Sequence, residues 1–246
     1  MNIDHIRNVW NSEHPKDKIP KGANVWNAIK SKFRKTCKEG RAECIVAHML
    51  TKPEAPESWG VNPEEWLSSD DIENIEKEYK KIFNDYYYVD TVPIDFDKKE
   101  SGKCIVSALC DIQLSKLLNK GKERVGIVFN TDTSSGPGQH WIALFCDMRS
   151  NLKYPQITYF DSYGEKPEKE IVVLMDRWNN QLEEMGFPKP SLQYNKTEDQ
   201  YQHSECGMYC LYFHFCCLME IPMDERVSDE FVRGLRGKLF KIKNKK

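Results

Sequence analysis

Gln200-Tyr-Gln-His-Ser-Glu-Cys206-Gly207 is the stretch that decides the fold and the chemistry of this 246-residue chain. His140 and Asp161 precede it in the sequence. A cysteine, a histidine and an acid are the nucleophile, base and orienting group of acyl transfer, and a nearby glutamine amide can donate to the oxyanion. We therefore predict that Cys206, His140, Asp161 and Gln200 are the catalytic residues.

A helix is predicted to begin near Cys206 and to end near Met219, because an apolar run follows the cysteine. A thiol at a helix N-terminus lies at the positive end of the backbone dipole, which favours the thiolate. Gly207 would let a substrate approach the backbone closely. The alternative is that Cys206 is one more buried cysteine on this helix, but the histidine and acid upstream favour a nucleophile.

Three β-like runs precede this helix, at residues 125–129, 141–146 and 157–160. If the second and third form an antiparallel hairpin that turns near Ser150, His140 and Asp161 lie almost opposite each other. The carboxylate could then hold one ring nitrogen while the other faces the thiol.

Two questions at this site stay open in the sequence. Gln202 lies close enough to Gln200 to compete for the oxyanion role. A metal site is the other alternative, but zinc sites combine a short Cys-x2–4-Cys pair with ligands from elsewhere, whereas most of these ligands fall on one helix. We therefore expect no metal and no organic cofactor. The ligands of that alternative would be His203, Cys206, Cys210 and His214.

The periodicity of apolar residues divides the chain into two parts. Residues 1–85 are predicted to form a helical N-terminal arm, and residues 86–246 the core domain. Further predicted elements are helices at 22–35, 42–50, 69–83 (with Ser69 as N-cap), 104–118, 167–185 and 229–242, and a strand at 192–194.

Composition limits the compartment and the partners. The formal net charge is −2, but residues 14–41 hold nine Lys or Arg against two acids, and the last nine residues hold five lysines. Such basic segments can contact DNA or an acidic partner, although a solvated surface is the commoner role. No apolar run is long enough for a membrane span, and no secretory signal is visible. Nine cysteines without a disulfide spacing favour reduced thiols in an intracellular, reducing environment.

The pattern His-Trp … Asp … Gln-x5-Cys-Gly resembles the adenovirus-protease and SUMO-protease clan of cysteine proteases. Within that clan the chain is similar to the polyprotein-processing proteases of African swine fever virus and related large DNA viruses. The swine fever sequence has Asn at the position of Asp161. The acid in this chain is instead shared with the cellular SUMO proteases. The segments that carry this likeness are 128–132, 135–141, 147–149, 159–162 and 205–207.

The resemblance implies an α+β fold with a mixed sheet between helices. It implies a cysteine endopeptidase that cleaves after Gly-Gly in viral core polyproteins during virion maturation, as a late protein of the host cytoplasm or virus factory that is packaged in the virion. The alternative within the clan is a protease that deconjugates SUMO or ubiquitin-like modifiers. A catalytically dead binding module is a third possibility, which the complete catalytic set disfavours. The expected substrate-binding residues are Trp141, Asn130, Gly207 and Gln202.

Overall fold

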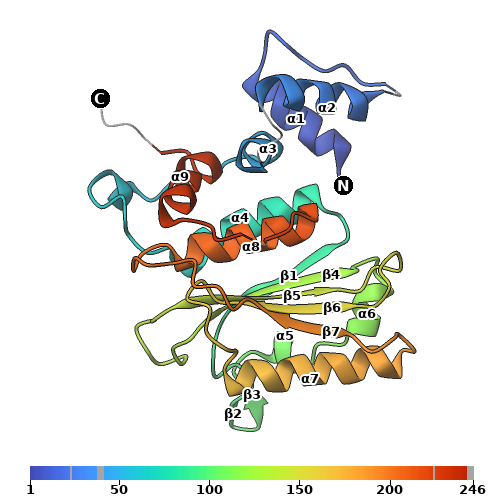
Figure 1. Cartoon of the computed structure of the whole chain (residues 1–246), viewed down its shortest axis with the longest axis vertical. Coiled ribbons are helices and arrows are strands. Elements are labelled where there is room, and N and C mark those ends of the chain that lie inside the picture. The colour runs from blue at the N-terminus through green and yellow to red at the C-terminus, as the bar shows by residue number, and fades with distance from the viewer. Residues whose placement is uncertain (23, 38–41, 224, 243–246) are drawn as a thin grey trace.

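A five-stranded mixed sheet lies between two layers of helices (Figure 1). The computed structural model describes residues 1–246 except 23, 38–41, 224 and 243–246. The strand order is β1-β4-β5-β6-β7, with parallel pairs at the two edges and antiparallel pairs in the centre. This confirms the predicted α+β class. The strands are β1 (Tyr86–Pro93), β4 (Arg124–Asn130), β5 (Trp141–Asp147), β6 (Gln156–Phe160) and β7 (Ser191–Tyr194).

The hairpin of β5 and β6 has the predicted antiparallel pairing. Ala143 lies opposite Phe160, and the same register continues to Asp147 opposite Gln156. Every residue of β5 is buried. Such a strand has helices on both faces, which explains why its sequence is a continuous apolar run rather than an alternating one.

Strand β1 was not predicted from the sequence. It pairs in parallel with β4 and is irregular between Tyr88 and Thr91. The Tyr86 side chain of β1 needs the space beside Gly126 of β4: a Cβ atom at Gly126 would lie 2.1 Å from the Tyr86 hydroxyl. Glycine at 126 is therefore what allows the Tyr86 ring to cross beneath β4.

Helices α4 (Ser69–Ile82) and α8 (Cys206–Met219) cover one face of the sheet, and α7 (Lys169–Glu184) covers the other (Figure 1). Helix α8 was predicted with these bounds. Helix α4 begins one residue earlier than predicted, because Ser68, not Ser69, is the N-cap. The Ser68 and Asp71 side chains form a reciprocal capping box.

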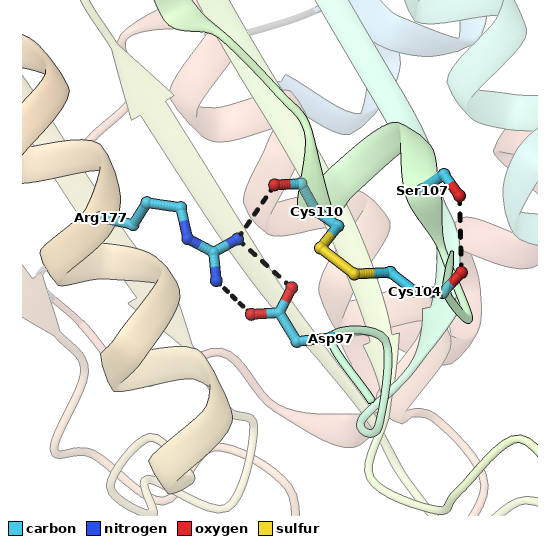
Figure 2. Close-up of a disulfide and its surroundings, with 5 residues drawn as sticks. All are labelled: Asp97, Cys104, Ser107, Cys110 and Arg177. Carbon is cyan, nitrogen blue, oxygen red and sulfur yellow. Dashed lines mark hydrogen bonds and ion pairs between the residues drawn. A yellow bond between two sulfur atoms is a disulfide. The ribbon is translucent and has the colours of Figure 1, made fainter. Parts of the chain in front are cut away.

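The helix predicted over residues 104–118 is wrong. The segment instead contains the end of a short hairpin and two short helices, because the helical backbone is interrupted between Asp111 and Gln113, which is extended. Figure 2 shows that Arg177 of α7 forms an ion pair with Asp97 and reaches the Cys110 carbonyl oxygen, 3.5 Å from Nη1. The elements are β2 (Lys99–Glu100), β3 (Lys103–Cys104), α5 (Ser107–Cys110) and α6 (Leu114–Leu118).

The N-terminal helices pack together and onto α9. One hydrophobic cluster runs from Ile6 and Trp10 through α4 to Trp141 and Cys206. The hydrophobic packing therefore continues across the predicted boundary between residues 85 and 86. The two-domain division stays a prediction. Of the described residues, no helix is both long and apolar enough to cross a membrane. The elements are α1 (Ile3–Glu13), α2 (Val25–Thr36), α3 (Ala42–Met49), the 3-10 turn η2 (Glu57–Gly60) and α9 (Asp229–Leu239).

Four of the nine cysteines are paired, in contrast to the expectation of reduced thiols. Cys37 pairs with Cys44, and Cys104 pairs with Cys110 (Figure 2). Both pairs close short loops, since the partners are 7 and 6 positions apart in the sequence. The sequence spacing alone did not reveal them, because neither forms a recognised framework.

A buried glutamate–histidine pair joins α4 to α8. His214 Nδ1 lies 2.6 Å from Glu76 Oε1, and both side chains are fully buried. The Tyr86 hydroxyl donates to Glu76 Oε2 at 2.8 Å, and His214 Nε2 lies 3.3 Å from the Leu144 carbonyl oxygen. Four elements of the core therefore meet at one polar network.

We expect Glu76→Ala to lower the free energy of unfolding by about 3–5 kcal/mol, because it leaves buried polar groups without their partner. Chemical denaturation would measure the change. Glu73→Ala is the matched control on the same helix. Glu73 is partly exposed, pairs with Lys77 at 3.6 Å and interacts with Asp90, so its loss should cost less than about 1 kcal/mol. Equal effects of the two substitutions would contradict a structural role for the network.

Candidate active site

The structure brings Cys206, His140 and Asp161 together where three elements meet. Cys206 is the first residue of α8, His140 directly precedes β5, and Asp161 directly follows β6. His140 Nε2 lies 2.7 Å from Asp161 Oδ1, and the same ring interacts with the Cys206 thiol. The Cys206 side chain is 2% exposed. A histidine between a carboxylate and a thiol is the arrangement of a nucleophile with an oriented base.

The charged form of His140 is stabilised by its neighbours. Burial of the ring works against the charge, but the hydrogen bond with Asp161 and the interactions with Cys206 outweigh it and raise the pKa of His140 to about 9. The Tyr163 ring stacks on His140 with centroids 4.8 Å apart. Tyr163 thus restrains the face of the imidazole, and Asp161 and Cys206 restrain its edge.

Gln200 is fully buried and its amide is oriented by a residue that the sequence reasoning missed. The Ser162 hydroxyl donates to Gln200 Oε1 at 2.7 Å. This fixes the amide NH2 on the other side, where it donates to the Gln202 carbonyl oxygen and to the Tyr163 hydroxyl. Ser162 directly follows Asp161, and that adjacency was the available signal.

Gln200 and Gln202 differ in their partners. The Gln202 side-chain oxygen accepts a hydrogen bond from Arg233 of α9. Gln202 therefore faces Arg233 with its side chain and Gln200 with its backbone carbonyl. The Gln200 amide instead donates to the hydroxyl of Tyr163, whose ring stacks on His140.

The turn that presents Cys206 is held by a buried carboxylate. Glu205 is fully buried, and its Oε2 lies 3.1 Å from Arg236 Nε of α9. Arg236 also donates to the Ser204 carbonyl oxygen at 3.3 Å, and the Ser204 hydroxyl donates to Glu205 at 3.1 Å. The position of the nucleophile therefore depends on a helix that is distant in sequence.

Gly207 has a packing role that differs from the expected one. A Cβ atom there would lie 3.0 Å from Leu67 Cβ and 3.2 Å from Trp141 Cδ1. The space beside Gly207 is thus filled by protein rather than open to a substrate. The Trp141 indole is held in turn, because its Nε1 donates to the Leu67 carbonyl oxygen at 3.0 Å.

A cavity of about 700 Å³ begins at Trp141 and Leu67 and is partly lined by the glycine-rich loop after β4. Asn130, expected to bind substrate, lines it but also holds that loop: its Oδ1 accepts from the backbone N–H groups of Asp132 and Gln139. Trp141 and Asn130 therefore border the same hollow. Its other lining residues include Ser68, Thr91, Pro93, Ser134 and Gly138.

The four residues of the metal alternative do not share one site. His214 is engaged with Glu76 between α8 and α4, whereas His203 is exposed. Cys210 lies deeper in α8, where burial raises the pKa of its thiol well above the ordinary value.

The fold is SUMO-protease-like. A protein-family model described as YopJ Serine/Threonine acetyltransferase matches residues 98–223, which is half of the chain and contains His140, Asp161 and Cys206. The chain belongs to this family.

Proteins of two groups of large DNA viruses are similar to this chain in sequence. The R355 protein of Acanthamoeba polyphaga mimivirus, a thiol protease candidate by name, is 32% identical over 165 residues. The cysteine protease S273R of African swine fever virus, isolate Tick/Malawi/Lil 20-1/1983, is 28% identical over 171 residues. Each alignment covers 67% of this chain, and the chain spans 52% and 62% of the length of these relatives, respectively.

Solved structures show the same fold. The crystal structure of the African swine fever virus pS273R protease matches with a TM-score of 0.65 and 19% identity, over 95% of this chain and 87% of that one. The C-terminal Ulp1 protease domain, solved in complex with the yeast SUMO ortholog Smt3, matches with a TM-score of 0.53 and 14% identity, over 90% and 94%.

We expect Ser162→Ala to lower kcat about tenfold with little change in KM, because it frees the Gln200 amide to turn its oxygen toward the site and weakens oxyanion stabilisation. Steady-state kinetics on a cleavable peptide would measure both constants. Ser191→Ala, at the start of β7, is the control and should leave kcat unchanged. An equal loss in both variants would exclude a positioning role for Ser162.

Proposed function

We propose that the chain is a cysteine endopeptidase with Cys206 as nucleophile. The observation that carries the proposal is the position of His140, which lies between the Asp161 carboxylate and the thiol at the start of α8. The names of the viral relatives, cysteine and thiol proteases, support the same activity.

In the proposed reaction the Cys206 sulfur attacks the scissile carbonyl carbon. The carbonyl oxygen becomes an oxyanion, which the Gln200 amide and the Cys206 backbone N–H stabilise. A helix suits this task because its first N–H groups have no intrahelical partner. The Gln200 donor that now meets the Gln202 carbonyl would turn to the oxyanion.

His140 completes both halves of the reaction. As imidazolium it gives its proton to the leaving amine, which leaves the acyl group as a thioester on Cys206. The neutral ring then takes a proton from water, whose oxygen attacks the thioester carbon. The C–S bond breaks, the product leaves as a carboxylic acid, and the thiolate–imidazolium pair is restored. Asp161 holds the ring in one orientation throughout.

We propose that the substrate is a viral structural polyprotein cut after Gly-Gly. Trp141 is buried and held by Leu67, so the wall it forms is fixed. A fixed aromatic wall next to the nucleophile leaves little room for substrate side chains. It therefore favours glycine residues before the cleaved bond, as in a Gly-Gly junction. The neighbouring cavity would receive residues of the polypeptide farther from the cut.

Two alternative functions are each supported by one observation. The family description names an acetyltransferase, and a Cys206 thioester could pass its acyl group to a hydroxyl instead of water. The likeness in fold to the Ulp1 domain points to deconjugation of a SUMO-like modifier.

The test compares three substrates with wild type and Cys206→Ser under reducing conditions. They are peptides with Gly-Gly-x, Ala-Gly-x and control junctions, SUMO and ubiquitin with C-terminal reporters, and acetyl-CoA with a serine-containing acceptor protein. We expect cleavage of Gly-Gly-x peptides that is lost in Cys206→Ser and kept in Cys217→Ser, a control on the same helix. Acetyl transfer without cleavage, or turnover of the modifiers alone, would move the chain to the corresponding class.

The pKa of His140 predicts the alkaline limit of activity. Because Asp161 and Cys206 raise this pKa to about 9, the imidazolium persists through neutral pH, and kcat/KM should fall only above about pH 9. Asp161→Asn removes the carboxylate that favours the charge, so we expect the alkaline limb to move to lower pH. A pH profile of kcat/KM for both proteins measures the shift, and an unmoved limb would contradict the role of Asp161.

Cytoplasmic location and contact with DNA or an acidic partner stay predictions. The basic segment 14–41 and the lysine tail fall partly outside the described residues, at 23, 38–41 and 243–246. A steep loss of DNA binding with rising salt would support the nucleic-acid contact.

A further inference from the structure

Metal-ligating side chains gather where the first three helices meet, away from the catalytic centre. Cys37 is the C-cap of α2, Cys44 and His48 lie four residues apart on α3, and His14 is the C-cap of α1. One ligand atom each of Cys37, Cys44 and His48 lie within 4.8 Å of one another. The same holds for Glu13, His14 and His48, so His48 links the two groups.

Both histidines are oriented as metal ligands are. His48 Nδ1 lies 3.1 Å from Glu13 Oε2, and His14 Nδ1 lies 3.1 Å from the Trp10 carbonyl oxygen. Each partner oxygen only accepts, so in the neutral rings Nδ1 carries the hydrogen and Nε2 carries the lone pair. A histidine that binds zinc commonly donates its other N–H to a carboxylate or a carbonyl in this way.

An aromatic shell limits access of water to the cluster. His14 stacks on Trp10 with ring centroids 3.9 Å apart, and His48 contacts the rings of Trp10 and Phe33 at 5.5 and 6.2 Å. Cys37 is 2% exposed. The ligands therefore come from three helices: Cys37 is buried, and Cys44, His48 and His14 are partly buried beside these rings.

We propose that the dithiol form of this chain binds one zinc ion through Cys37, Cys44 and His48, with His14 as the fourth ligand and Glu13 orienting His48. Two cysteines and two histidines are a common structural zinc set. Metal–ligand distances of about 2.0–2.3 Å place tetrahedral ligand atoms about 3.3–3.8 Å apart, which the cluster reaches with small movements. Binding releases the two thiol protons. The proposal differs from the sequence-based expectation that no metal is bound.

The Cys37–Cys44 disulfide and the zinc site exclude each other, because the same two sulfur atoms serve both. A thiol reductant converts one form to the other: it is oxidised to its own disulfide, and the two cysteines receive the electrons and two protons. The N-terminal helices are thus tied together in either state, by a covalent bond or by a metal.

A second cluster, Asp97 with Cys104 and Cys110, provides the internal comparison. It contains no histidine, and its carboxylate is already paired with Arg177 (Figure 2). We expect this cluster to bind zinc weakly or not at all.

The test is zinc content after reduction, incubation with zinc chloride and removal of loose metal, measured by mass spectrometry on the full chain. We expect one zinc per chain in wild type and in the Cys104→Ser/Cys110→Ser control, and none in Cys44→Ser or His48→Ala. Glu13→Gln should weaken affinity about 10- to 100-fold. Cobalt in place of zinc should give a thiolate-to-metal charge-transfer band.

Protection of wild-type thiols tests the site without any substitution that can unfold the arm. With zinc bound, Cys37 and Cys44 should resist alkylation and become reactive when a chelator is added. Reduced wild type that retains no zinc, or zinc that is retained equally by Cys44→Ser and His48→Ala, would overturn the proposal.

Discussion

The hydrogen bond between His140 and Asp161 is the interaction on which the site depends. It forms because β5 and β6 are adjacent and antiparallel, which brings the residue before one strand beside the residue after the other. The carboxylate, together with Cys206, outweighs the cost of burying the imidazolium, and the ring then has a fixed orientation toward α8. Without this bond, burial would favour a neutral ring that is free to turn away from the thiol.

The scaffold supplies the second requirement, which is a fixed position for the start of α8. Glu205 and Arg236 hold the turn before Cys206, and Glu76 with His214 holds the same helix two turns further on. Each of these links joins segments that are distant in sequence. A helix fastened at both places can present its first residue to His140 with little freedom, as a preorganised site requires.

Much of the site could be predicted because its groups lie on elements with strong local signals. The apolar run behind Cys206 gave the helix bounds, and the two buried strands gave the hairpin. Ser162 was missed because its role depends on a hydrogen bond to Gln200, 38 residues away. Strand β1 was missed because its parallel pairing with β4 leaves no turn signal in the sequence.

Other errors have local physical causes. Residues 104–118 are apolar enough for a buried helix, but the helical backbone is interrupted at Asp111–Gln113, which leaves two helices of 4 and 5 residues. The paired cysteines were unforeseen because closeness in space, not spacing along the chain, brings them together. Gly207 was assigned to the substrate, whereas Leu67, from a segment that precedes the sheet, fills that space.

The central claim is that Cys206 alone among the unpaired thiols is activated. Burial raises the pKa of the thiols of Cys146, Cys210 and Cys217 well above the ordinary value and that of Cys216 to about 12. The direct measurement is limited alkylation with iodoacetamide at neutral pH, followed by peptide mapping of the five unpaired cysteines. Modification of Cys206 first, and its slowing in His140→Ala, is the predicted result. Earlier modification of the more exposed Cys217, or a rate at Cys206 that is indifferent to His140, would contradict the account.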